Sequence, residues 1–512
     1  MNGAESLVRT LISSGVDTCL ANPGTSEIHF VAALDRNPGM RCVLALFEGV
    51  VTGAADGYGR MARKPAATLM HCGPGMANGL SLLHNAKRAC TPIINIVGDQ
   101  ATYHAPLDPP LASDVEGWAR QVSQWVYKAK NSREVGSAAA AAVQQACRAP
   151  GGSATLILPS DVSWREPGEE ARALTVPAPA KSSPEQITGA VRALRSGQPA
   201  VLLVTGAALL PENLRSAHKV AAATGARLMT PTFNARIARG RGRPPLDAVP
   251  YPVDEAVALL KGTKHIVSAG TGAPVAFFAY PGKPGIVSPE DAQLHVLARP
   301  DQDIPDALER LAAELNCRDS AIAEIAPEPV PQDGTLTVEN AARVVSALLP
   351  DDAIIVDEAI SLRGPFFRAT KNAAPHDWLQ VPGGAIGGGP PLSTGAAIGA
   401  PGRRAIVLEG DGSAMYTVQA LWTQAREKLD VTTLILSNRK YNILEIELRA
   451  AGAPQGNSAS DLFEIDRPGI DWVKMANAQG VEAARADTVS RFADLFRAAN
   501  ARRGPFLIEL VL

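Results

Sequence analysis

Residues 405–413 read AIVLEGDGS, and residues 431–442 read VTTLILSNRKYN. In each segment a run of apolar, mostly β-branched residues ends in a polar turn, which is typical of a buried parallel strand. Open parallel sheets bind their ligands at the carboxyl ends of the strands. The two segments therefore predict an α/β fold in which both polar turns lie at the ligand-binding edge of a parallel sheet.

The two polar turns carry the oxygen ligands that a hard divalent cation prefers. Asp411 and Asn438 supply side-chain oxygens, and the backbone carbonyl of Lys440 adds a third. Magnesium is bound in this way by a few protein oxygens together with phosphate oxygens of its ligand. Ser413 and the free N–H groups at the following helix start can hold a diphosphate. A GDG turn alone is a weak signal, so the prediction depends on the pair of turns.

The pattern of buried strands and turns recurs along the whole chain in three groups. Proline- and charge-rich segments at 164–186 and 325–334 separate the groups and are interpreted as linkers. A chain of 512 residues fits three domains at roughly 150 residues each. We therefore predict an α/β protein of three consecutive doubly wound parallel-sheet domains, at 1–165, 185–328 and 338–512.

The middle domain is expected to be Rossmann-like, with its last strand at GIVSP, 285–289. Its first strand ends at Gly206 and lacks the GxGxxG sequence of a dinucleotide site. A structural role is therefore favoured over a bound nucleotide or flavin, and both remain open.

Composition excludes several classes of partner. The net charge is −2, from 49 basic and 51 acidic residues, which provides no field for nucleic acid or an anionic membrane. With 46% apolar and 20% charged residues, wholesale disorder is excluded. No apolar run has membrane-spanning length, and none of the six cysteines forms a CxxC pair. We expect a cytoplasmic protein that binds neither nucleic acid nor membrane.

Further motifs resemble the thiamine-diphosphate-dependent enzyme superfamily. The GDG turn followed by Asn438 is similar to its diphosphate and metal signature. The segments NPGTSE (22–27), FEG (47–49) with AADGY (54–58), and HCGPG (71–75) resemble its pyrimidine-binding domain. The order of pyrimidine, middle and diphosphate domains covers the whole chain. GDGSAMYTVQALWTQA resembles benzoylformate decarboxylase, whereas VPGGAIGGGPPLSTGAA and VAFFAYPGKPG look more like acetolactate-synthase-type proteins.

The resemblance implies three catalytic residues. Glu48 would be the carboxylate that hydrogen-bonds N1′ of the aminopyrimidine and so promotes loss of the proton on C2 of the cofactor. Its apolar sequence neighbours would favour this sharing of a proton by desolvation. His71 matches a catalytic histidine of benzoylformate decarboxylase, and Thr25 keeps the hydroxyl of a substrate-binding serine. The alternatives are an exposed helix-start glutamate and a structural histidine.

The resemblance also assigns a cofactor site. Ser361 would reach the diphosphate, the carbonyl of Gly388 the pyrimidine amino group, and the metal would bind Asp411, Asn438 and Lys440. Pro390 stands where a Leu, Ile or Met usually supports the bent cofactor, so either this support is unusual or the alignment shifts here. The full set of cofactor positions is Ser361, Gly388, Pro390, Gly410, Asp411, Gly412, Ser413, Asn438, Tyr441, Asn442 and Ile443.

These assignments imply thiamine-diphosphate- and Mg²⁺-dependent decarboxylation of a 2-oxo acid, whose intermediate is protonated to an aldehyde or added to a second carbonyl compound. The alternatives are an acetolactate-synthase-like carboligase, with or without flavin, and a non-catalytic cofactor-binding paralogue. Retention of Glu48, Asp411 and Asn438 argues against the paralogue. The resemblance implies a homodimer or homotetramer with active sites at subunit interfaces.

Two departures from benzoylformate decarboxylase bear on the substrate. Its middle-domain histidine is missing, with Ala279 near the matching place, and Ile443 replaces a small alanine over the reactive carbon. His104 could supply the lost proton relay, although a surface histidine is an equal alternative. We expect a short aliphatic 2-oxo acid such as pyruvate or 2-oxobutyrate.

Overall fold

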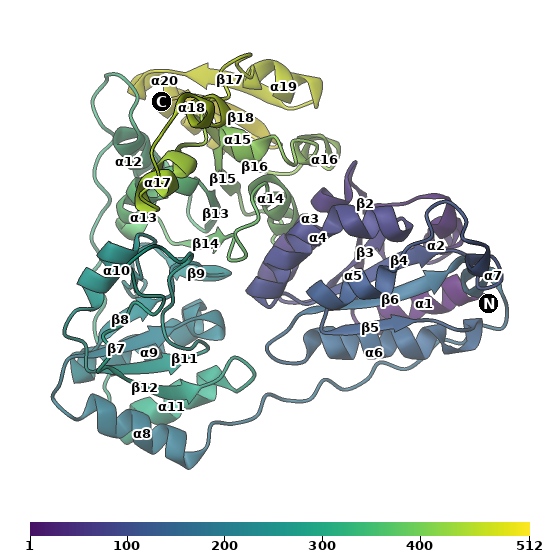
Figure 1. Ribbon diagram of the computed structural model, residues 1–512, viewed down its shortest axis with the longest axis horizontal. Helices are drawn as coiled ribbons and strands as arrows, with labels where there is room; N and C mark the ends of the chain where they lie inside the picture. Colours follow the sequence, from purple (N-terminus) through teal and green to yellow (C-terminus); the bar gives the residue numbers. More distant parts are fainter.

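The computed structural model describes all 512 residues and contains three sheets, of six, five and seven strands (Figure 1). Within each sheet the strands pair in parallel, apart from one antiparallel edge strand in the third. Helices connect most successive strands, as is usual for parallel pairing, whereas β9 (Arg236–Arg239), β10 (Asp247–Ala248) and β12 (Gln293–Ala298) follow loops alone. The expected α/β class with three parallel-sheet domains is confirmed. None of the helices has the length and apolar character needed to cross a bilayer.

The N-terminal sheet is buried and covered by helices on its faces. Its strands, in spatial order, are β2 (Arg41–Leu44), β1 (Thr18–Asn22), β3 (Ala66–Met70), β4 (Ile93–Asp99), β6 (Ser153–Pro159) and β5 (Trp125–Lys128). Its helices are α1 (Gly3–Ser13), α2 (Ile28–Arg36), α3 (Glu48–Ala62), α4 (Cys72–Ala89), α5 (Val115–Val122), α6 (Val135–Cys147) and α7 (Ser160–Trp164). An extended segment then runs to the second sheet (Figure 1).

The middle sheet differs from the sequence prediction in its last strand. Its order is β10 (Asp247–Ala248), β8 (Arg227–Thr230), β7 (Ala200–Val204), β11 (His265–Ala269) and β12 (Gln293–Ala298). Its helices are α8 (Pro184–Leu194), α9 (Pro211–Thr224), α10 (Val253–Leu260) and α11 (Ile304–Glu314). Residues 285–289 form only an isolated bridge between Val275 and Ile286, so the prediction of a strand there is wrong. The true strand β12 lies at an edge and is partly exposed, so it lacks a continuous apolar run.

The C-terminal sheet has the order β17 (Glu482–Ala486), β18 (Phe506–Val511), β16 (Val431–Ser437), β15 (Ala405–Gly410), β13 (Ala353–Glu358), β14 (His376–Gln380) and β9 (Arg236–Arg239). Its helices are α12 (Val338–Leu348), α13 (Arg363–Ala369), α14 (Gly389–Gly399), α15 (Asp411–Ala414), α16 (Ala420–Arg426), α17 (Asn442–Ala450), α18 (Asn457–Phe463), α19 (Trp472–Ala478) and α20 (Val489–Ala501). Strand β9 comes from the middle part of the chain and pairs antiparallel with β14. One buried apolar cluster accordingly spans the middle and C-terminal sheets.

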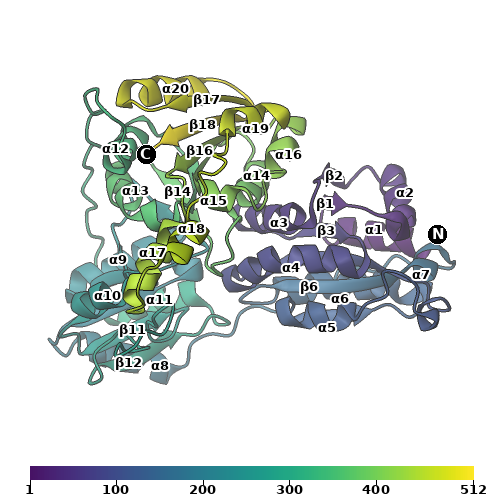
Figure 2. The ribbon, with the colours of Figure 1, turned by 45° about the horizontal axis from the view of Figure 1, so that its top comes forward.

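Helices α3 and α14 join the N-terminal and C-terminal sheets (Figure 2). They pack so closely that a Cβ at Gly57 would collide with the carbonyl of Leu392, and one at Gly395 with that of Ala54. Only glycine allows the two backbones to approach each other this closely. A second buried apolar cluster therefore continues from the N-terminal sheet into the C-terminal one.

Candidate active site

The expected metal ligands lie together at the carboxyl edge of the C-terminal sheet. Strands β15 and β16 are neighbours, with Gly410 opposite Leu436, so the turns that follow them meet. Asp411 accepts hydrogen bonds from the backbone N–H groups of Gly412 (2.9 Å) and Arg439 (2.6 Å). Asn438 Oδ1 accepts the N–H of Lys440 at 3.2 Å. Burial raises the pKa of Asp411, and a bound cation would favour its charged form.

The residues expected around the diphosphate flank these turns. The Ser413 hydroxyl donates to Glu409 and to the carbonyl of Gly410. Asn442 Nδ2 donates to the Ser361 hydroxyl at 3.2 Å, which brings two further expected residues together. The ring of Tyr441 lies over Gly412, where a Cβ would collide with it.

The two expected residues at the start of α14 are both buried. Gly388 immediately precedes the helix, and its carbonyl accepts the N–H of Leu392 at 2.9 Å. One lone pair of that oxygen is left for a ligand. The Pro390 carbonyl accepts the hydroxyls of Ser393 (2.7 Å) and Thr394 (2.9 Å). The cofactor roles of both residues stay predictions.

A pair of buried carboxyl groups lies next to the start of α14, and the sequence did not point to it. Glu358 ends β13, and Glu409 lies opposite it, one residue before the end of the neighbouring strand β15. Glu358 Oε2 accepts the N–H of Gly389 at 2.6 Å. Burial raises the pKa of Glu358 to about 7, and burial with the nearby Glu358 raises the pKa of Glu409 well above its ordinary value. The only sequence signal was a glutamate at or next to the end of each apolar strand.

Replacing Glu358 with Gln is expected to flatten the pH dependence of stability. Because the pKa is raised from 4.5 to about 7, the stabilisation from Glu358 is present below pH 4.5 and is lost as the pH rises to about 7. At about 1.4 kcal/mol per pKa unit this amounts to roughly 3 kcal/mol. Melting temperatures of cofactor-free wild type and variant between pH 5 and 8 measure it, with the exposed Glu339→Gln as control. Equal pH slopes in all three proteins would contradict the assignment.

Glu48 is the first residue of α3 and is buried, with 6% of its surface exposed. This burial argues against the alternative of an exposed helix-start glutamate. Its Oε2 accepts a hydrogen bond from Asn78 Nδ2 at 3.0 Å. A Cβ placed on Gly75 would lie 3.0 Å from Glu48 Oε1 and 3.5 Å from His71 Cβ, so both side chains flank this glycine. Two of the expected catalytic residues thus lie close together.

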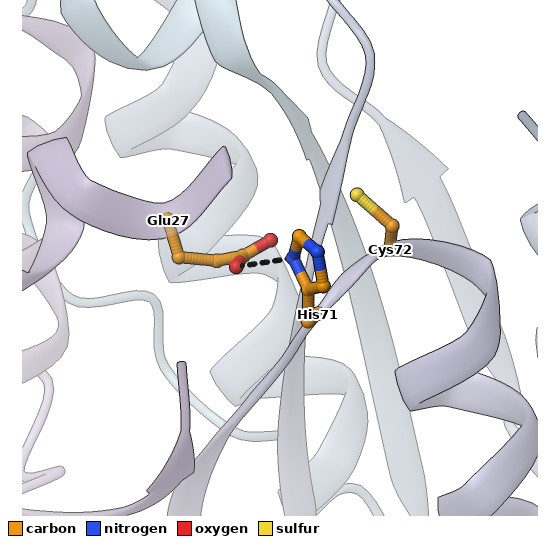
Figure 3. Close-up of side chains that lie close together, drawn as sticks. All are labelled: Glu27, His71 and Cys72. Carbon is orange, nitrogen blue, oxygen red and sulfur yellow. Dashed lines mark hydrogen bonds and ion pairs between the residues drawn. The ribbon is translucent and has the colours of Figure 1, made fainter. Parts of the chain in front are cut away.

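His71 is held by a glutamate that the sequence did not single out. His71 Nδ1 and Glu27 Oε2 lie 2.9 Å apart (Figure 3). The same oxygen accepts the N–H of Gly24 at 2.9 Å. The histidine ring packs against Gly24, where any Cβ would collide with it. Burial raises the pKa of Glu27. The paired Glu27 fixes the orientation of His71.

Cys72 completes this cluster, and one ligand atom from each of Glu27, His71 and Cys72 lies within 4.8 Å of the others. Cys72 Sγ lies 3.1 Å from the Ser26 hydroxyl, and burial raises the pKa of the thiol to about 11. The thiol is therefore protonated at neutral pH and is no nucleophile.

The remaining expected residues are more exposed. Thr25 begins a short 3₁₀ turn (Thr25–Glu27), and His104 lies on the surface without a side-chain hydrogen bond. No hydrogen bond or ion pair within the chain joins the Glu48–His71 group to the Asp411–Asn438 group. The chain thus carries two separate halves of the expected site.

Comparison with known proteins places both halves in one family. Residues 1–125 match the N-terminal TPP binding domain of thiamine pyrophosphate enzymes, and residues 365–510 match the C-terminal TPP binding domain. The chain is 49% identical to IlvX of Mycobacterium tuberculosis, over 100% of this chain and 99% of that protein. IlvX is assigned by inference to the acetolactate synthase large subunits. It is 29% identical to benzoylformate decarboxylase of Pseudomonas aeruginosa, over 97% of this chain and 96% of the other.

A solved structure agrees with these matches. The thiamine diphosphate-dependent 4-hydroxybenzoylformate decarboxylase of Rhodococcus jostii RHA1 superposes with a TM-score of 0.87 at 25% identity, covering 100% of this chain and 99% of the other. The likeness extends over all three sheets. The chain therefore belongs to the thiamine pyrophosphate enzyme family, which includes the 2-oxo acid decarboxylases and the acetolactate synthases.

Proposed function

We propose that the chain catalyses thiamine-diphosphate- and magnesium-dependent decarboxylation of a short aliphatic 2-oxo acid, with carboligation as a second outcome. The observation that carries the proposal is the burial of Glu48 next to His71 in a chain that also brings Asp411 and Asn438 together. A non-catalytic paralogue would have no need to keep both halves of the site.

The residues at the C-terminal edge fit the cofactor and the metal. Asp411, Asn438 and the carbonyl of Lys440 are oxygen donors of the kind magnesium prefers. Ser413 and the N–H groups that begin α15 would hold the diphosphate. When bound, the cofactor supplies the carbon nucleophile that attacks the keto carbon.

The N-terminal residues would handle protons and the substrate. Glu48 would exchange a proton with the aminopyrimidine ring from a buried position, where Asn78 donates a hydrogen bond to it. His71, oriented by Glu27, and the exposed hydroxyl of Thr25 would contact the substrate carboxylate.

We also propose that two copies of the chain complete the site. Large apolar side chains are exposed beside both halves: Ile28 (55%) and Leu46 (47%) near Thr25 and Glu48, and Tyr416 (53%) near Ser413. Exposed apolar surface of this kind next to a site marks an interface. We expect light scattering to give the mass of two or four chains, and a single-chain mass would contradict the proposal.

Ile443 is proposed to limit the size of the substrate. It is the second residue of α17 and lies shortly after the expected metal ligand Lys440. Ile is stiff at χ1, and overpacking a closed pocket destabilises by about 1–3 kcal/mol, or roughly one to two factors of ten in selectivity. We expect wild type to prefer pyruvate to benzoylformate, and Ile443→Ala to shift this preference toward benzoylformate.

The values of kcat/KM for both acids, in both proteins, test this proposal. If Ile443 only packs in the protein, the alanine variant will lose stability and keep the same order of substrates. A wild type that prefers benzoylformate would overturn the proposed substrate class.

An acetolactate-synthase-like carboligase is the second candidate function. It is favoured by the 49% identity to IlvX and by a cavity of about 1230 Å³ that adjoins the carboxyl ends of β7, β8 and β11. This is the edge at which doubly wound sheets bind ligands. A yellow protein with a flavin absorbance spectrum would support a flavin-containing carboligase. A colourless protein that releases CO₂ would support the simple decarboxylase.

A further inference from the structure

Helix α17 occupies a functional position without being anchored in a core. It begins at Asn442, two residues after the expected metal ligand Lys440, and none of its residues is buried. Its first two residues are Asn442, which contacts Ser361, and Ile443. Since apolar burial normally fixes a helix in place, other contacts must hold α17 over the site.

Two tyrosines from the middle part of the chain make such contacts with a single carboxylate. The Tyr251 hydroxyl donates to Glu447 Oε1 at 2.8 Å, and the Tyr280 hydroxyl donates to Glu447 Oε2 at 2.7 Å. Both tyrosines and Glu447 are half-buried, which strengthens hydrogen bonds to a charged group. Figures 1 and 2 show α17 at the junction between the middle and C-terminal parts.

The two tyrosines that bind Glu447 are themselves held in place by packing. Tyr251 packs against Phe233 and Phe277, with ring centroids 6.3 Å and 5.5 Å away. Phe277 in turn lies against Gly384, in the loop that leads to α14. The Tyr251 hydroxyl therefore comes from a packed aromatic cluster, and Tyr280 packs against a buried apolar cluster of the middle sheet.

Ile443 and Glu447 are four residues apart and so share one face of α17. On that face Glu447 contacts Tyr280, the residue that follows Ala279. We propose that Glu447 is a positioning residue: by binding Tyr251 and Tyr280 it fixes the placement of Asn442 and Ile443 at the active site. The effect of Glu447 on catalysis rests on the proposed function, whereas its contact with the two tyrosines does not.

Hydrogen exchange of α17 tests the contact independently of any reaction. In the full-length protein with thiamine diphosphate and Mg²⁺, the Tyr251→Phe/Tyr280→Phe double variant keeps both rings and removes both donors. We expect amide exchange in 442–450 to rise at least about tenfold, as expected when a hydrogen bond to a charged group is lost. The exposed Tyr103→Phe is the matched control and should leave exchange unchanged. Unchanged exchange in the double variant would overturn the proposal.

A second variant keeps the test valid if the double variant unfolds. Glu447→Gln keeps the shape of the side chain and removes its charge, so its exchange rate should lie between wild type and Glu447→Ala. Equal exchange in all three would overturn the proposal.

Substrate discrimination separates positioning from a purely structural role. In Glu447→Ala we expect kcat to fall about tenfold. We also expect the preference for pyruvate over benzoylformate, measured as the ratio of the two kcat/KM values, to change in the same direction as in Ile443→Ala. Faster exchange with an unchanged ratio would mean that Glu447 only stabilises the helix, which contradicts a positioning role. Absence of CO₂ release in wild type would contradict the proposed function and leave the exchange result standing.

Discussion

A Glu48→Gln variant is expected to lose at least about a hundredfold in turnover while keeping its fold and its affinity for thiamine diphosphate. The change preserves the shape of a buried side chain and leaves an oxygen to accept the hydrogen bond from Asn78. It removes the group that exchanges a proton with the cofactor ring, and positioned acid–base groups contribute roughly 10²–10⁴ in rate. Steady-state turnover, together with cofactor titration by calorimetry, measures the two properties separately.

The matched control for Glu48 is Glu116→Gln. Glu116 is also a glutamate at the start of a helix, in α5, but its side chain is 39% exposed and pairs only with Arg120 on its own helix. Its substitution should leave turnover unchanged. If Glu48→Gln keeps more than about a third of wild-type activity, well outside the range of acid–base effects, the assignment of the proton relay is wrong.

An Asp411→Ala variant is expected to lose the stabilisation that cofactor and metal confer. Ligand at a hundred times its dissociation constant stabilises a folded protein by about 2.7 kcal/mol, seen as a rise in melting temperature. Asp411 is an expected magnesium ligand, and it also accepts the N–H of Arg439, which joins the two turns, and the N–H of Gly412 in its own turn. The measurement is the shift in melting temperature on adding thiamine diphosphate and Mg²⁺.

Asp494→Ala serves as the control for this experiment. Asp494 lies on α20 of the same part of the chain, is exposed, and pairs with Arg497. It should show the full wild-type shift on ligand addition. A full shift in Asp411→Ala would place the metal elsewhere.

The strands that carry the C-terminal half of the site could be predicted because the signal is local. Strands β15 and β16 are continuous apolar runs that end in polar turns, and the structure brings Asp411 next to the turn after Asn438. The pairing of β9 with β14 could not be predicted. It joins segments about 140 residues apart, and the sequence of a short edge strand does not specify its partner.

The side chains that support the expected site were also beyond sequence reasoning. Glu27 lies in the loop after β1, and His71 lies in the turn after β3. Only the packing of these two segments against each other shows that Glu27 is the partner of His71. Glu358 and Glu409 form a pair only through the register of β13 with β15. Local patterns predict which residues end a strand, but these contacts depend on how separate loops pack together.

The most direct test of the account is CO₂ release from pyruvate by protein stripped of cofactor and metal and then reconstituted. We predict release only when thiamine diphosphate and Mg²⁺ are both added, with loss of at least about a hundredfold in Glu48→Gln measured alongside. Release that needs neither addition, or the absence of release from pyruvate and from every other aliphatic or aromatic 2-oxo acid tried under full reconstitution, would contradict the account.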